Sequence, residues 1–154
     1  MFFKSAFGVQ RYTLEVLPGV QHEITSAYPY KHLSKEEKAK AYTVLERTYT
    51  VLDSSTNIAI VPNLNPCICI IVHYRTKAAV FHQHFSSSIT DLIAKAKAHL
   101  GINESANPEE IKIYIYAFEA YNFNTVWKAR YQNRTQEAEL AQIKRNLMQA
   151  FGIT

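Results

Sequence analysis

Three segments of this chain have the apolar pattern of a β-strand, either alternating apolar and other residues or a short apolar run. In QRYTLEVL the alternating residues are Tyr12, Leu14 and Val16, and the short segment NIAIVP is apolar up to Pro62. In EIKIYIYAFEA both sets of alternate positions are apolar, as expected for a strand that is buried on both faces. We therefore predict three strands, the last of them central in its sheet.

Three other segments repeat their apolar residues every three or four positions, which is the pattern of a helix that packs on one side. They are residues 34–52, residues 88–101 and a closing segment from about Thr135 to Phe151. The first two begin with a serine followed three positions later by an acidic residue, the spacing of a capping box. The second also ends at Gly101, in the place of a C-cap glycine. All three segments are predicted helices.

The stretch CICIIVHYRTKAAVFHQHF, residues 67–85, contains both cysteines of the chain and three of its six histidines. It divides into two apolar runs around a central Arg-Thr dipeptide, so the simplest interpretation is an antiparallel hairpin with a two-residue turn. Cys67 then faces His84, and Cys69 faces His82. Facing residues lie on one side of a sheet with their Cβ atoms about 4.5 to 5.5 Å apart, so each thiol is predicted to lie within reach of an imidazole.

The predicted elements follow one another as strand, helix, three or more strands, helix, strand and helix. No linker or repeat divides the 154 residues, so we predict a single domain over residues 1–154. The fold class is α/β of the α+β type. We expect a mostly antiparallel, layered and sandwich-like β core, flanked by about three helices.

Composition narrows the classes of partner. Hydrophobic residues make up 47% and charged residues 19% of the chain, as in an ordinary soluble domain, and the net charge of +4 is spread along the sequence. This does not favour nucleic acid as a partner. No apolar run is long enough to span a membrane or to form a signal peptide, and the two cysteines are too close in sequence to bridge readily, so a cytoplasmic location is predicted, with export by another route left open.

The facing cysteines and histidines admit three interpretations. A thiol beside an imidazole is the minimum equipment of a cysteine nucleophile, because the ring can accept the proton of the thiol. Cys67, Cys69, His82 and His84 together also offer two sulfurs and two nitrogens, a common ligand set for zinc, although their spacing along flat strands is unusual for such a site. In the third interpretation, the cysteines are small core residues and the histidines bond to backbone.

The segment from about residue 57 to 101 resembles the cysteine deamidase superfamily. The similarity consists of a cysteine at the start of an apolar strand, a tight hairpin, and a histidine 15 or 17 residues later that is followed by a small-residue turn and an amphipathic helix, as in HFSSSITDLI. The interval from Cys67 to His84 matches the chemoreceptor glutamine deamidases and the protein N-terminal asparagine amidohydrolases. The interval from Cys67 to His82 matches the cytotoxic necrotizing factor toxins.

This resemblance implies a hydrolase that acts on a glutamine or asparagine carboxamide of a protein substrate, through a thioester and without a cofactor or metal. Cys67 is then the nucleophile, His84 the first choice for the acid and base, and His82 the second choice. Asn65 or Ser86 orients the ring, and Asn65 is also a possible oxyanion donor.

Two further expectations accompany this assignment. Because Cys67 lies at a strand end beside a turn, we expect a partly exposed, reactive thiol with a depressed pKa, whereas Cys69 is expected to be inert. The alternative is a non-enzymatic interaction module, whose sign would be a Cys67 that is buried away from any cleft.

Overall fold

The computed structural model describes residues 12–16, 34–61, 67–84, 87–118 and 136–154. No helix in these ranges is long and apolar enough to cross a membrane. In chain order the elements are β1 Tyr12–Val16, α1 Lys35–Ala39, β2 Ala41–Thr43, β3 Tyr49–Asp53, β4 Ile58–Ile60, β5 Ile68–Tyr74, β6 Lys77–Gln83, α2 Ile89–Leu100, the 3₁₀ turn Pro108–Glu110, β7 Ile111–Phe118 and α4 Gln136–Phe151.

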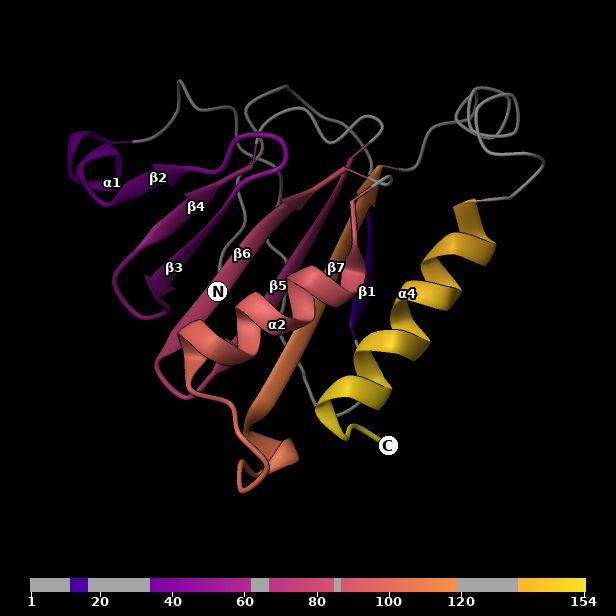
Figure 1. Cartoon of the computed structure of the whole chain (residues 1–154). Helices are drawn as coiled ribbons and strands as arrows, with labels where there is room; N and C mark the ends of the chain where they lie inside the picture. Colours follow the sequence, from indigo (N-terminus) through magenta and orange to yellow (C-terminus); the bar gives the residue numbers. More distant parts are fainter. Residues whose placement is uncertain (1–11, 17–33, 62–66, 85–86, 119–135) are drawn as a thin grey trace.

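Five strands form an antiparallel sheet in the order β1-β7-β5-β6-β3 (Figure 1). β7 lies between β1 and β5, so the predicted central strand is confirmed. Its apolar residues on both sides are explained by this position, because each face of the sheet is covered. The predicted strand at residues 12–16 is also confirmed, as β1.

The hairpin of β5 and β6 has the predicted register. Tyr74 pairs with Lys77 across a two-residue turn, and Cys69 pairs with His82. The turn requires a left-handed residue, and Arg75 adopts it with φ of 55° although arginine has no preference for that conformation.

One face of the sheet packs against α2 and α4 (Figure 1). The core on this side is made of aliphatic and aromatic residues, among them Ile70, Ile113 and Leu147, which are fully buried. The predicted helix over 88–101 is confirmed with its caps, since the Asp91 N–H donates to Ser88 Oγ and Gly101 has a φ of 70°. The closing helix is confirmed as α4.

The opposite face of the sheet is covered by a small parallel sheet of β2 and β4. Val44, Ala59 and Val61 of this cover pack in one cluster with Cys67 and Cys69 of the large sheet. The predicted NIAIVP strand is β4, and it pairs with β2 rather than joining the large sheet. The α+β class and the helices flanking an antiparallel sheet are therefore as predicted.

The predicted helix over 34–52 is wrong beyond its first turn. Its capping box forms, with the Glu37 N–H donating to Ser34 Oγ over 3.1 Å and the Ser34 N–H donating to Glu37 Oε2 over 2.8 Å. The helix nevertheless ends at Ala39, and the chain continues into β2 and β3. The residues that follow are rich in threonine, valine and tyrosine, which favour strands, and pairing with β4 and β6 decides the outcome. The loop predicted over residues 19–31 lies outside the described residues.

Candidate functional site

Cys67 and His84 lie at the same end of the β5–β6 hairpin. The last paired residues there are Ile68 and Gln83, so Cys67 immediately precedes β5 and His84 immediately follows β6. Strand alternation puts both side chains on the face that β2 and β4 cover. Cys67 is 1% exposed within that cluster, whereas the side chain of His84 is 15% exposed.

A third residue, Glu46, links this pair. Its Oε1 atom is 3.9 Å from His84 Nε2, and its carboxylate lies close enough to Cys67 to act on the thiol by charge and by hydrogen bonding. Glu46 belongs to the loop between β2 and β3. Two backbone bonds hold this loop against β6: the Arg47 N–H donates to His82 O over 2.8 Å, and the His82 N–H donates to Thr48 O over 3.0 Å.

The sequence prediction missed Glu46 because it placed this residue in a helix. In the structure the residue is brought to the hairpin by tertiary pairing of β3 with β6. The strand-forming residues from Tyr42 to Val51 were the one local signal that this part of the chain is extended. No motif spacing joins Glu46 to Cys67 or His84.

The expected exposure and pKa of Cys67 are corrected by the structure. The pKa of the Cys67 thiol is raised from 9.0 to about 12, mainly by burial and in addition by the charge and hydrogen bonding of Glu46, while the charge of Arg47 acts in the opposite direction. The thiol is therefore protonated at rest. Its exposed fraction of 1% differs little from the 2% of Cys69, so burial alone does not distinguish the two cysteines.

The surroundings of the two cysteines do differ. Burial alone raises the pKa of Cys69 far above its ordinary value, and no charged group contributes. Cys67 has a carboxylate and a guanidinium near it. Cys67 is thus the cysteine with chemical partners, and Cys69 is a core residue.

His82, the second choice for the catalytic histidine, has a structural bond. It is 2% exposed, and its Nδ1 donates to the carbonyl oxygen of Val44 over 2.9 Å, which fixes the cover to the sheet. Its Nε2 has no hydrogen-bond partner among the described residues. The imidazole that lies beside a carboxylate is that of His84.

Asn65 and Ser86 lie outside the described residues. Within the described ranges, no group of three or more histidine, cysteine or acidic residues is arranged to hold a metal ion. The zinc interpretation needs Cys67, Cys69 and both histidines to converge on one point, and the Nδ1 atom of His82 is already bonded to backbone.

Comparison with models of protein families, with curated proteins and with solved structures finds no match to this chain. The resemblance to cysteine deamidases therefore stays a prediction.

Proposed function

We propose that this protein is a cysteine hydrolase that converts a glutamine or asparagine carboxamide of a protein substrate into a carboxylate. The observation that carries the proposal is the Glu46 carboxylate, which lies 3.9 Å from His84 and next to Cys67. A thiol, an imidazole and a carboxylate in one place are the groups that a nucleophile, its base and the partner of that base require.

Each group has a role in the proposed reaction. The Cys67 thiol gives its proton to His84 as the sulfur attacks the carboxamide carbon, which forms a tetrahedral intermediate. His84 returns the proton to the nitrogen, ammonia leaves, and a thioester to Cys67 remains. Water, deprotonated by His84, then attacks the thioester and releases the carboxylate and the thiol.

Glu46 is a positioning residue in this scheme. Its carboxylate lies beside the ring nitrogen Nε2 of His84 and would stabilise the positive charge that the ring gains in each proton transfer. The raised pKa of Cys67 makes such a base necessary, because at neutral pH the resting thiol holds its proton and attack must coincide with proton transfer.

His84 rather than His82 fits the role of the base. The Nδ1 proton of His82 is committed to Val44 O, and its ring is 2% exposed. His84 has the greater exposure, 15% of its side chain, and has the carboxylate partner. The choice of His84 also agrees with the predicted hairpin register. Ile68 pairs with Gln83, and Cys67 and His84 are the next residues outward on the two strands.

The test is ammonia release from end-blocked peptides that contain glutamine or asparagine, with product mass as a second readout. We expect Cys67→Ala to abolish release and His84→Ala to reduce it by about 100-fold or more, since a positioned acid or base contributes that much. Cys69→Ala is the matched control and should keep the wild-type rate. Equal release by wild type and Cys67→Ala would exclude this mechanism.

A non-enzymatic interaction module is the second candidate, and the burial of Cys67 favours it. At 1% exposure the thiol is not open to solvent in this conformation. The module predicts no ammonia release from any peptide and no difference in partner binding between wild type and His84→Ala. The two candidates are thus separated by the same set of variants.

A further inference from the structure

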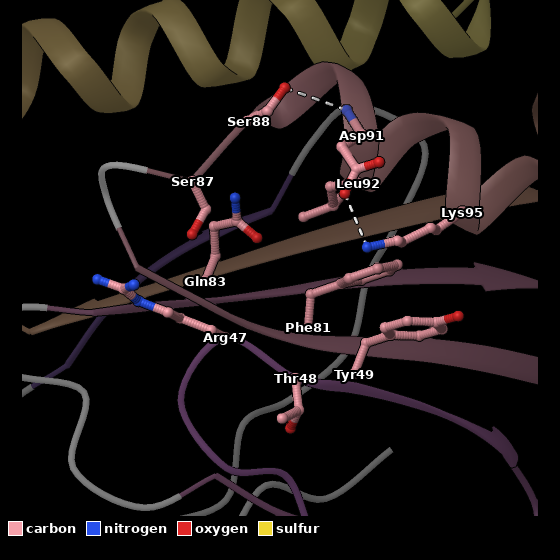
Figure 2. A pocket seen from close by; sticks show the side chains of 10 residues that line it. All are labelled: Arg47, Thr48, Tyr49, Phe81, Gln83, Ser87, Ser88, Asp91, Leu92 and Lys95. Atoms are coloured by element: carbon pink, nitrogen blue, oxygen red, sulfur yellow. Dashed lines mark hydrogen bonds and ion pairs between the residues drawn. The ribbon is translucent and has the colours of Figure 1, made fainter.

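A second site lies on the other side of the β6 end from Cys67. It is a small pocket between the start of β3, the end of β6 and the first turns of α2 (Figure 2). Successive residues of a strand point to opposite faces, so Gln83 faces this pocket while His84 faces the cysteine cluster. Arg47 also lines this pocket, whereas Glu46, the residue before it, lies beside His84.

Gln83 is the first sign of a ligand. The residue is 9% exposed, and its side-chain amide makes no hydrogen bond to another of the described residues. In Figure 2 this amide rises from β6 toward Ser87, in the wall of the pocket. The amide atoms are not among the buried unpartnered polar atoms of the described residues, so they reach the solvent of the pocket and can bond to a polar group that enters it.

Arg47 is the second sign. Its backbone is fixed, because its N–H donates to His82 O over 2.8 Å and its φ is 63°. In the described part of the chain its side chain has one ion pair, with Glu46 at 3.8 Å between Nε and Oε1, and both side chains are exposed. That distance is longer than the roughly 2.7 to 2.9 Å of a charge-assisted hydrogen bond, so the guanidinium fork has donors to offer.

The charges of the lining select the kind of ligand. Lys95 and Asp91 pair with each other at 2.7 Å between Nζ and Oδ2. Arg47 has only the longer 3.8 Å contact with Glu46 among the described residues, so it is the least closely paired charge of the pocket wall. The first turn of α2 adds the positive end of a helix dipole. A ligand with one negative charge matches the single guanidinium, whereas the second charge of a phosphate would find no further cation among the described lining residues that is not already paired.

We propose that this pocket binds a single carboxylate group. The Arg47 guanidinium donates to both carboxylate oxygens in the planar fork geometry, and the Gln83 amide nitrogen donates a further bond. The carboxylate belongs either to an acidic side chain of a protein or to a free organic acid. This inference concerns binding alone and does not rest on the proposed hydrolase.

The experiment is a titration of the full chain, labelled with ¹⁵N, and followed through the side-chain NH₂ signals of Gln83 and the Nε–H signal of Arg47. The probes are glutamate blocked at both ends, acetate, inorganic phosphate, and blocked glutamine as the neutral shape control. We expect blocked glutamate or acetate to shift both signals and to bind more tightly than phosphate and blocked glutamine. Tighter binding of blocked glutamate than of acetate indicates a protein side chain, and the reverse order a free acid.

Arg75 provides a matched control for Arg47. Both arginines have positive φ, both are exposed, and each is paired with one glutamate. Arg47→Ala should weaken carboxylate binding by about tenfold or more, as for the loss of hydrogen bonds to a charged group, and Arg75→Ala should leave it unchanged. Arg47→Lys, which keeps the charge and removes the fork, should also weaken binding.

Three results would overturn the proposal. They are the absence of any shift at Gln83 in the wild-type protein, equal weakening by Arg47→Ala and Arg75→Ala, and tighter binding of phosphate or blocked glutamine than of the carboxylates. The first uses no variant, so it decides the question even if an arginine variant fails to fold.

Discussion

The face of the sheet under α2 and α4 has a core of aliphatic and aromatic side chains, whereas the face under β2 and β4 buries two thiols and an imidazole in the same sheet. Both faces exclude water. Apolar residues would fill either space without a titratable group, and the histidine is buried with one ring nitrogen that has no partner among the described residues. The helix-covered face is thus an apolar core, whereas the other face buries polar, titratable side chains at a cost in stability, which is where the proposed hydrolase site lies.

The largest expected effect is a difference in the free energy of unfolding between a substitution on the helix-covered face and one on the cysteine-bearing face. Ile70, fully buried under the helices, and Cys69, 2% exposed under the small sheet, are neighbours in β5. Ile70→Ala should lower the free energy of unfolding by about 2 to 5 kcal/mol, because it leaves a cavity, and Cys69→Ala by about 1 kcal/mol. Urea unfolding measures both. Equal losses would mean that the two faces contribute to stability in the same way.

Alkaline pH should destabilise the cysteine-bearing face. Burial raises the pKa of Cys67 from 9.0 to about 12, so above pH 9 the unfolded chain loses this proton while the folded chain keeps it. Stability is therefore fully present below the unfolded pKa and falls as the pH rises toward the folded pKa. From about pH 8 to 10.5 wild type should lose about 2 kcal/mol more than Cys67→Ala.

Urea unfolding of both proteins at the two pH values checks this difference. Cys69 and the other titrating groups are common to both chains and cancel in the comparison. If the gap between wild type and Cys67→Ala is the same at both pH values, the thiol is not buried as described.

A smaller effect is expected for Glu46, whose substitution should change the alkylation rate of Cys67 and the rate of ammonia release in opposite directions. Glu46→Gln removes a charge that raises the pKa of Cys67, so the thiolate fraction near pH 8 should increase, and alkylation by iodoacetamide should accelerate. Ammonia release should instead fall, because His84 loses the carboxylate beside its ring. Glu104→Gln, an exposed acid elsewhere on the surface, is the control and should change neither rate. A parallel rise or fall of both rates would remove Glu46 from its positioning role.

Local signals were sufficient for the hairpin and for α2. The two apolar runs around Arg75 fixed the loop length, and loop length fixes which residues face each other, so Cys69 and His82 were paired correctly. The serine and acidic residue at the start of α2 and the glycine after it are interactions within one or two turns. Contacts of this kind can be predicted from neighbouring residues in the sequence alone.

Tertiary contacts decided the parts that were missed. From Tyr42 to Leu52 the apolar spacing also suits a helix, and the partners that make this segment extended, β4 and β6, come later in the chain. For this reason Glu46 and Arg47 were not foreseen beside His84 and Gln83. The burial of Cys67 was missed for the same reason, since the strand end it occupies is covered by Val44 and Val61 of the second layer.

The most direct test of the central claim, that Cys67 is a nucleophile served by His84 and Glu46, is capture of the thioester. Wild type would be mixed with end-blocked glutamine and asparagine peptides, quenched in acid, digested and mapped by mass. The account predicts an acyl group on Cys67 that is retained in Cys69→Ala and lost in His84→Ala. Acylation of Cys69 instead, or no acylation of folded wild-type protein by any of the peptides, would contradict it.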